Sequence, residues 1–311
     1  MKILITGGAG YIGNVLTREL LNNNHKVTII DNFIFNQQAS LIDICKNNNL
    51  QIIKSDIRNI KNLNNEIGKH DVIIPLAGIV GAPACDINPD LATEINLTQI
   101  QNIKKNLSKN QIVILPVTNS GYGIGTKDIY CDENSNLNPI SHYGKTKVEA
   151  EKVISDLENF VSLRLATVFG VSARMRLDLL VNDFVYTAFK DKYLVLFESH
   201  FKRNYIHIDD IAFLIKKILI NFDEFKGNIF NVGLEDANLS KKELCEKIKE
   251  FLPKTLILEN EFYQDPDQRN YIVSNKKIYS KGWKPIRSIE YGINELIKCY
   301  QFFEKNDFKN I

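Results

Sequence analysis

Cysteine is scarce in this sequence of 311 residues, and the five cysteines are scattered along it. They are Cys45, Cys85, Cys131, Cys245 and Cys299. No two of them have the C-x-x-C spacing of a redox pair or a structural zinc site, and their odd number argues against a disulfide framework. We therefore expect a protein of the reducing cytoplasm that uses no metal.

Long apolar runs and a strong net charge are also lacking. No stretch approaches the roughly 20 apolar residues that span a bilayer, and residues 1–6 lead into a glycine-rich loop without the pattern of a signal peptide. The 39 Lys and Arg residues nearly balance the 37 Asp and Glu residues, which leaves a net charge of +2. No global field would recruit nucleic acid or a membrane surface, so neither is expected as a partner.

Short apolar runs alternate with helical patterns through the first half of the chain. The runs cover residues 2–6, 26–30, 51–54, 72–76, 111–115 and 160–165. Most are continuous, as expected for strands that are covered on both faces. One helical pattern extends over 91–107, with Asp90 as its expected cap. The alternation predicts an α/β fold with a Rossmann-type, doubly wound parallel sheet.

The second half of the chain is less regular. Its patterns predict helices over residues 177–190, 209–221 and 288–303 and a strand over 228–232. Ser240, followed three residues later by Glu243, predicts a capping box that opens a helix ending near Phe251. Since no flexible linker separates the halves, we expect the second half to pack on the first as a smaller α/β lobe.

A glycine-rich loop, residues 6–13 (TGGAGYIG), follows the first strand. Three of its glycines are spaced three residues apart. Gly7 suits a tight turn, Gly10 allows a close approach to a pyrophosphate, and Gly13 allows the helix to pack closely on the strand. The helix N-terminus then offers N–H groups to phosphates. Asp31 ends the next strand, where a carboxylate would bind ribose and favour NAD over NADP by repelling a 2′-phosphate. Asp56 and Ile57, after the third strand, either cradle adenine or simply end that strand.

Tyr143 and Lys147 lie four residues apart and therefore share one face of a helix. A tyrosine with the ordinary pKa of about 10 is a poor base at neutral pH, but a nearby ammonium stabilises the phenolate. The pair follows a strand and loop that carry Thr118, and loops at the carboxyl ends of parallel strands meet at the ligand crevice. A solvent-facing helix pair is the alternative, but this context favours a catalytic site.

These motifs resemble those of the extended short-chain dehydrogenase/reductases that act on nucleotide sugars. The resemblance covers nearly the whole chain and includes Leu76-Ala77-Gly78, Asn96 and residues 203–210, 269–271 and 282–285. It implies an NAD-dependent enzyme with a nucleotide-sugar substrate, and a homodimer or higher homo-oligomer formed through the helices near residues 90–107 and 141–157. The implied Rossmann domain comprises residues 1–168 with 204–233, and the nucleotide-sugar-binding lobe comprises 169–203 with 234–311.

The same resemblance implies roles for site residues. Tyr143 would be the acid/base, Thr118 would hold the sugar hydroxyl and Lys147 would grip the nicotinamide ribose. The implied cofactor-binding residues are Gly7, Gly10, Tyr11, Ile12, Gly13, Asp31, Asn32, Asp56, Ile57, Leu76, Ala77, Gly78, Asn96, Tyr143 and Lys147. The implied substrate-binding residues are Thr118, Asn119, Ser120, Arg174, Arg176, Asn182, Arg203 and Arg269.

The arginines suit a diphosphate because a guanidinium forms bidentate hydrogen bonds with phosphate oxygens. The resemblance places Arg269 at the substrate diphosphate. Arg203 either joins it or forms a salt bridge with Asp209 or Asp210. Arg174 and Arg176 either face phosphate or lie on the surface, and His207 is expected to be structural.

The shared first step of such enzymes is hydride transfer from sugar C4 to NAD, with removal of the O4 proton by the tyrosine. Dehydratases of the family carry a Thr-Asp-Glu triplet, where this chain has Thr118-Asn119-Ser120. Neither Asn119 nor Ser120 can act as a general acid or base near neutral pH, so elimination of water is disfavoured unless Asp86 or Glu133 reaches the site.

Two reactions therefore remain, net oxidation at C4 and epimerisation at C4. Residues 80–85, 118–125 and 167–178 resemble a subgroup encoded in bacterial surface-polysaccharide gene clusters. That likeness favours oxidation of GDP-D-glycero-alpha-D-manno-heptose to its 4-keto sugar for capsule biosynthesis, with a UDP-hexose 4-epimerase as the alternative. A non-enzymatic regulator and a reductase of a substrate without a nucleotide are further alternatives.

Overall fold

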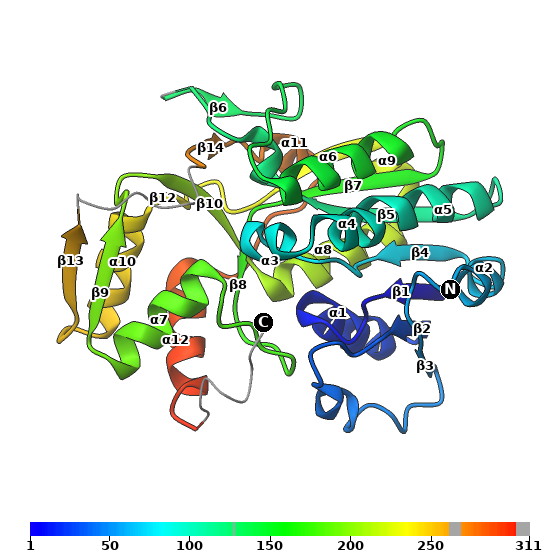
Figure 1. Cartoon of the computed structure of the whole chain (residues 1–311), viewed down its shortest axis with the longest axis horizontal. Coiled ribbons are helices and arrows are strands. Elements are labelled where there is room, and N and C mark those ends of the chain that lie inside the picture. The colour runs from blue at the N-terminus through cyan, green and yellow to red at the C-terminus, as the bar shows by residue number, and fades with distance from the viewer. Residues whose placement is uncertain (127, 261–268, 303–311) are drawn as a thin grey trace.

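The computed structural model describes residues 1–126, 128–260 and 269–302. A seven-stranded sheet lies at the centre of the larger part of the molecule (Figure 1), with the strand order β11-β7-β5-β4-β1-β2-β3. All the paired strands of this sheet run parallel. Its strands are β1 (Lys2–Thr6), β2 (Lys26–Asp31), β3 (Leu50–Lys54), β4 (Val72–Pro75), β5 (Ile112–Thr118), β7 (Phe160–Leu165) and β11 (Asn228–Val232). The predicted Rossmann-type α/β fold is confirmed.

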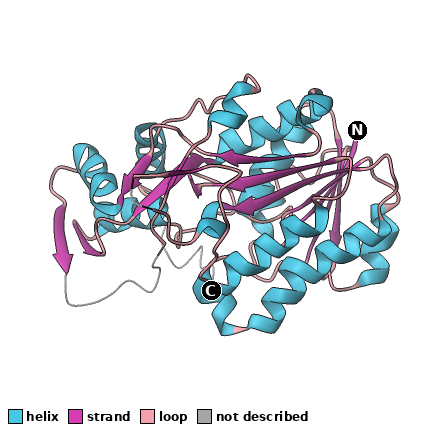
Figure 2. Ribbon diagram, turned by 90° about the horizontal axis from the view of Figure 1, so that it is seen from above, coloured by secondary structure: helices cyan, strands magenta, loops and turns pink. Residues whose placement is uncertain are grey.

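Helices cover both faces of this sheet (Figure 2). Successive side chains of a strand point to opposite faces, so Ile3 and Ile5 of β1 join one apolar core and Leu4 joins another. The first core also contains residues of α1 (Tyr11–Asn22), α8 (Ile208–Ile220) and α11 (Lys276–Ser280). The second contains residues of α2 (Ile60–Ile67), α5 (Gln99–Asn106) and α6 (His142–Ile154). This two-sided burial explains why the strands are continuous apolar runs.

The helix expected over residues 91–107 differs from the prediction. It consists of α4 (Pro89–Thr93), a π-helical segment η2 (Glu94–Thr98) and α5. Asn88, not Asp90, caps its start, because the Asn88 side chain accepts a hydrogen bond from the Leu91 N–H at 3.0 Å. The extra residue in the π-helical turn accompanies the burial of Asn96, which is 1% exposed.

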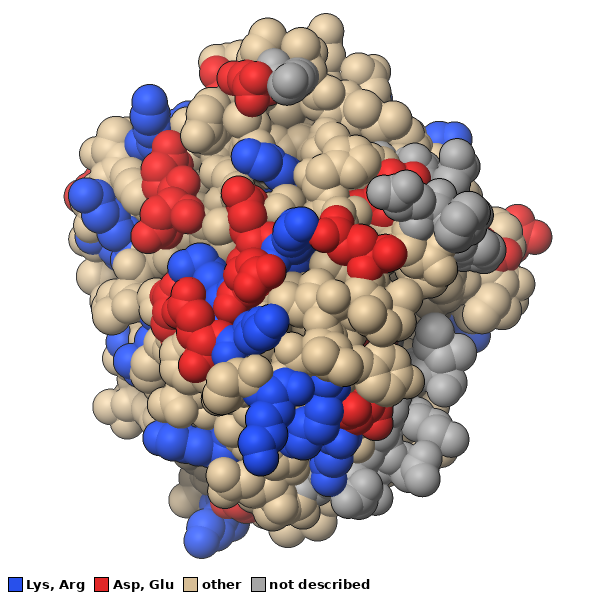
Figure 3. Space-filling view, turned by 90° about the vertical axis from the view of Figure 1, so that its left-hand side faces the viewer, with Lys and Arg blue, Asp and Glu red and all other residues tan. Residues whose placement is uncertain are grey.

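The smaller lobe has its own apolar core. Its main elements are α7 (Leu180–Lys190), α10 (Lys241–Phe251), α12 (Ile289–Cys299), and the parallel pair β9 (Tyr193–Phe197) and β13 (Leu256–Asn260). The capping box is confirmed, since Ser240 and Glu243 each accept the other's backbone N–H. On the end of the lobe seen in Figure 3, basic and acidic side chains are interspersed.

Smaller sheets connect the two parts of the molecule. β8 (Thr167–Phe169), β10 (Lys202–His207) and β12 (Asn238–Ser240) form a three-stranded sheet, and β6 (Tyr130–Cys131) pairs with β14 (Ile272–Val273). The remaining short elements are η1 (Gln38–Leu41), α3 (Ala82–Ile87), η3 (Asn119–Tyr122) and α9 (Phe222–Phe225). β10 lies outside the seven-stranded sheet, although its last residues fall in the predicted range of the Rossmann domain. None of the helices in the described ranges has the length and apolar character to cross a membrane.

Candidate active site

A cavity of about 860 Å³ opens at the carboxyl ends of the central strands, between the sheet and the lobe. In a doubly wound sheet this edge is the expected ligand crevice. The catalytic candidates Thr118, Tyr143 and Lys147 all line it, and so do most of the predicted cofactor residues. These are Gly7, Gly10, Tyr11, Ile12, Gly13, Asp31, Asn32, Ile57, Leu76, Ala77 and Gly78.

The glycine loop is shaped as a dinucleotide requires. Gly7 has a φ of +72°, and a Cβ there would lie 2.5 Å from the Ala77 N atom. A Cβ on Gly13 would lie 2.5 Å from the Gly7 carbonyl oxygen. Helix α1 begins at Tyr11 with Gly10 as its N-cap and no side-chain cap. No side chain caps its first N–H groups, and its first residues Tyr11, Ile12 and Gly13 line the cavity, which suits a pyrophosphate.

Asp31 ends β2 inside this cavity. Its carboxylate accepts hydrogen bonds from the Ala9 N–H at 3.0 Å and the Phe33 N–H at 2.8 Å. Burial raises the pKa of Asp31, and these hydrogen bonds act against that rise. The residues present therefore fit a dinucleotide: a close glycine turn, an uncapped helix start and a carboxylate for ribose.

Two predicted cofactor residues, Asp56 and Asn96, are not among the lining residues of the cavity. Asp56 is bound by Arg58, whose Nε lies 3.0 Å from its Oδ1, and this hydrogen bond lowers the pKa of Asp56 to about 2. Asn96 accepts the Ile79 N–H at 3.0 Å and donates to the Ile79 carbonyl at 2.9 Å. With their polar atoms used this way, both residues position the loops that follow β3 and β4, and neither belongs to the lining.

Helix α6 carries the predicted catalytic pair, Tyr143 and Lys147. It begins at His142, where the Ser141 hydroxyl accepts the Gly144 N–H at 3.1 Å. Burial raises the pKa of Tyr143 to about 12, and the charges of Arg176 and Arg269 and a side-chain interaction with Thr118 act in the opposite direction. A phenol with this pKa is not a base at pH 7, so the site needs further positive charge before Tyr143 can lose its proton.

Lys147 is 6% exposed, and burial lowers its pKa from 10.5 to about 8. The group is therefore mostly an ammonium at neutral pH, although burial disfavours that form. The Cys85 thiol is fully buried and close enough to interact electrostatically with Lys147, and burial raises its own pKa to about 11. No spacing pattern in the sequence indicated that Cys85 would lie there.

The Lys147→Met variant is expected to be more stable than the wild type below pH 8, by roughly 2–3 kcal/mol, while losing activity. Because the folded pKa lies below the unfolded value, the unfolded state binds more protons between about pH 8 and 10.5. The wild type therefore gains stability as the pH rises through that window, and the difference in the free energy of unfolding between the wild type and Lys147→Met becomes smaller. Urea unfolding of cofactor-free protein from pH 7 to 10 measures this, with the exposed Lys145→Met as control. A less stable Lys147→Met at pH 7 would contradict it.

On the substrate side, Ser120, Arg176, Arg203 and Arg269 line the cavity. Arg269 donates to the Ser120 hydroxyl, which also accepts from Thr118 at 2.9 Å. Arg203 is 3% exposed and lies over the Tyr271 ring, 5.7 Å from its centroid. The salt bridge considered for Arg203 is not formed, because Asp209 lies near His207 and Arg287, and Asp210 accepts two backbone N–H groups.

Three of the predicted substrate residues differ from expectation. Asn182 is not among the lining residues, and its amide donates to the Tyr11 hydroxyl at 3.2 Å and the Arg176 carbonyl at 2.9 Å and accepts the Gly170 N–H at 3.1 Å. Asn119 is 1% exposed and is also outside the lining. Arg174 lines the cavity but lies at Phe35, beside the cofactor residues. Arg174 lies in an irregular loop, where side-chain direction has no sequence period, so its position could not be predicted from the sequence.

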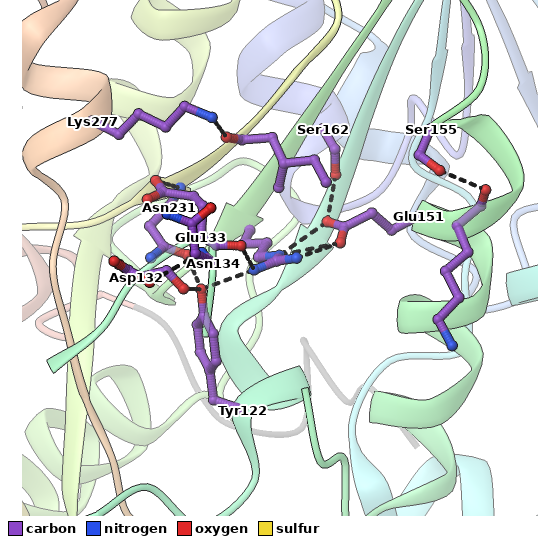
Figure 4. A network of polar contacts seen from close by, with 12 residues as sticks. Tyr122, Asp132, Glu133, Asn134, Glu151, Ser155, Ser162, Asn231 and Lys277 are labelled. Atoms are coloured by element: carbon purple, nitrogen blue, oxygen red, sulfur yellow. Dashed lines mark hydrogen bonds and ion pairs between the residues drawn. The ribbon is translucent and has the colours of Figure 1, made fainter. Parts of the chain in front are cut away.

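The acids that could serve elimination are placed elsewhere. Asp86 is exposed and outside the lining. Glu133 belongs to a buried polar network (Figure 4), where it accepts the Asn231 N–H at 2.7 Å. Of the lining residues that the structure describes, Asp31, Asp178 and Asp183 are the acids. Burial opposes ionisation of Asp178, but its ion pair with Arg176 outweighs this and lowers its pKa.

His207, Asp209 and Glu295 form the one group of potential metal ligands found among the described residues. The His207 ring is fully buried, and its Nε2 lies 3.0 Å from Glu295 Oε2. Its Nδ1 accepts the Asp209 N–H at 3.2 Å and so caps helix α8. Both ring nitrogens already have partners, which agrees with the structural role expected for His207.

Residues 3–233 of the chain match the NAD dependent epimerase/dehydratase family. The chain belongs to this family. The expectations of an enzyme and of NAD as its cofactor are thereby confirmed. A putative UDP-glucose 4-epimerase of Methanocaldococcus jannaschii is 26% identical over 310 residues, which cover 95% of this chain and 97% of that protein.

Solved structures of family members have the same fold. The Thermus thermophilus UDP-glucose 4-epimerase in complex with NAD has a TM-score of 0.83 and 20% identity, covering 97% of this chain and 99% of that one. The Bacillus cereus UDP-glucuronic acid 4-epimerase, solved with UDP-glucuronic acid and NAD, has a TM-score of 0.84 and 24% identity, with the same coverage of both chains. At these identities the likeness establishes the fold alone.

Proposed function

We propose that this protein oxidises C4 of a nucleotide-activated sugar. The observation that carries the proposal is the meeting of Thr118, Tyr143 and Lys147 in one cavity with the glycine loop and Asp31. NAD, when bound, supplies the hydride acceptor. The O4 proton leaves to Tyr143 as the C4–H bond breaks with its electron pair, which turns the alcohol into a ketone. Thr118 holds the sugar hydroxyl, and Lys147 stabilises the phenolate.

The charge of the cavity supports an anionic substrate. Beside Lys147, the basic lining residues of the described chain are Arg174, Arg176, Arg203, Lys241 and Arg269. Their excess over the acidic lining residues suits a nucleoside diphosphate, for which Arg203 and Arg269 are our candidates. Arg176 and Arg269 also favour the Tyr143 phenolate, so substrate binding and base formation would share the same positive charge.

Elimination of water is not part of the proposal. A dehydratase needs an acid that protonates the departing hydroxyl, and Asn119 and Ser120 cannot do so. Asp178 is held ionised by Arg176, and Asp86 and Glu133 lie away from the cavity.

For the substrate we propose GDP-D-glycero-alpha-D-manno-heptose, with release of the 4-keto sugar for capsule or surface-polysaccharide synthesis. The support is the likeness of residues 80–85, 118–125 and 167–178 to the Campylobacter capsule enzyme that carries out this oxidation. UDP-hexose 4-epimerisation is the second candidate, favoured by the UDP-glucose 4-epimerases among the relatives. We also propose a homo-oligomer that pairs through α4–α5 and α6.

A substrate panel tests the proposal. Purified protein is incubated with GDP-, UDP- and dTDP-sugars, with and without a keto acid that reoxidises retained NADH, and the products are identified by mass and NMR. We expect loss of two hydrogens from GDP-heptose. An isomer of unchanged mass would establish epimerisation instead, and loss of water would overturn the argument from Asn119 and Ser120.

A further inference from the structure

The loop between β8 and α7, residues 170–179, is tied to the start of the glycine-loop helix. The Ser172 hydroxyl donates to the Tyr11 carbonyl at 3.0 Å, and the Tyr11 hydroxyl donates to the Gly170 carbonyl at 2.6 Å. Asn182, at the start of α7, donates to the same Tyr11 hydroxyl at 3.2 Å. A loop of the smaller lobe is therefore fixed on the cofactor side of the cavity.

Arg174 extends from this loop toward the end of β2. It is 3% exposed, and its guanidinium carbon lies 4.5 Å from the centroid of the Phe35 ring. Phe35 follows Asp31 by four residues, and all three residues line the cavity. The charge of Arg174 acts on the Asp31 carboxylate and favours its ionised form.

Asp31 and Arg174 combine two features of which one usually selects NAD and the other NADP. A carboxylate at the end of β2 binds the ribose hydroxyls of NAD and repels a 2′-phosphate, whereas an arginine at that place accommodates the 2′-phosphate of NADP. Here the carboxylate comes from the sheet and the arginine comes from the lobe. The Arg174 guanidinium is buried, stacks on Phe35 and donates through Nη1 to the Met175 carbonyl at 3.1 Å, so its positive charge is held in place beside Asp31.

We propose that Arg174 belongs to the cofactor site and forms a selectivity pair with Asp31. Asp31 excludes NADP, and Arg174 offsets the charge of Asp31 and closes the lobe over the adenosine end of NAD. The inference depends on the NAD requirement of the family and is independent of the sugar, so a failed substrate panel would leave it standing.

The pair is tested by calorimetric titration of cofactor-stripped protein with NAD⁺ and with NADP⁺. Arg174→Ala is expected to weaken NAD⁺ binding roughly tenfold, since a charge-assisted contact is lost. Asp31→Asn removes the repelling charge, and NADP⁺ affinity should rise roughly tenfold because Arg174 can hold the 2′-phosphate. The double variant should lose that gain. Arg176→Ala, which removes an arginine of the same loop near Tyr143, is the matched control and should not change the NAD⁺ to NADP⁺ ratio.

Two results would overturn the proposal. One is unchanged NAD⁺ affinity in a folded Arg174→Ala protein, with folding checked by circular dichroism and thermal unfolding. The other is a gain of NADP⁺ binding in Asp31→Asn that survives in the double variant. If Arg174→Ala does not fold, Arg174→Lys replaces it, because it keeps the charge but loses the planar face, and its NAD⁺ affinity should still fall.

Discussion

Replacing Tyr143 by phenylalanine is expected to slow C4 oxidation roughly a thousandfold, which corresponds to about 4 kcal/mol of barrier. The variant lacks the phenolic oxygen that takes the O4 proton. The hydroxyl of Thr118, which lies near Tyr143, is not a base and cannot replace it. The ring itself remains, so packing and NAD binding should be retained. Single-turnover rates of NADH formation, measured at 340 nm, and the cofactor content of the purified protein give the two readouts.

The control for this variant is Tyr193→Phe, which removes a hydroxyl from a tyrosine that is 47% exposed on β9. It should leave the rate unchanged. Undiminished activity in Tyr143→Phe would eliminate the phenolate mechanism. Loss of both activity and bound NAD would instead indicate that the hydroxyl is needed to hold the cofactor.

The pH profile of the wild type should show which charges activate Tyr143. In the protein without ligands its pKa is raised to about 12 by burial. If bound NAD and Lys147 supply the remaining positive charge, the pKa in the complex falls toward neutrality. The rate should then rise with pH through that lowered value. Lys147→Met should move this rise to higher pH, which separates an electrostatic role of Lys147 from a purely structural one.

The sequence allowed the sheet and the placement of Tyr143 and Lys147 in one cavity to be predicted, because both follow simple periods. Strands buried on both faces must be apolar throughout, and a four-residue spacing puts Tyr143 and Lys147 on one helical face. The glycines of residues 7–13 could be assigned because close backbone approaches tolerate no Cβ.

No comparable sequence rule predicts the residues whose positions differ from expectation. Asn96 and Asn182 use their amides to hold backbone groups of neighbouring loops, and which backbone lies beside a side chain is decided by tertiary packing. Arg174 faces the cofactor side because Tyr11 fixes its loop, and this depends on contacts between residues about 160 positions apart in the sequence. The hydrophobic pattern of the sequence likewise did not predict the π-helical turn at Asn96.

A buried ion pair behind the catalytic helix was also not predicted (Figure 4). Glu151 lies one turn beyond Lys147 on α6, and its Oε1 is 2.7 Å from Arg164 Nη2 of β7. Ser162 donates to the other carboxylate oxygen at 2.8 Å, and Arg164 donates to the Tyr122 hydroxyl at 3.0 Å. The network therefore joins the helix of Tyr143 and Lys147 to η3, which follows Thr118.

Glu151→Ala is expected to lower the free energy of unfolding by about 3–5 kcal/mol, because it leaves the Arg164 guanidinium buried without its carboxylate. Urea unfolding measures this. Glu149→Ala, on the exposed side of the same helix, removes only a surface pair with Lys152 and should cost less than about 1 kcal/mol. Equal losses in the two variants would contradict a stabilising role of the buried pair.

The double variant Glu151→Leu/Arg164→Met separates stability from positioning. Removing both charges leaves no unpaired ion, so the free energy of unfolding should recover most of the loss seen in Glu151→Ala. The hydrogen bonds that align α6 with Tyr122 are then absent, so the rate of C4 oxidation should stay low although the protein is stable. If the rate recovers together with stability, the network serves folding alone, and the distance between Thr118 and Tyr143 is set by the apolar packing of α6 on the sheet.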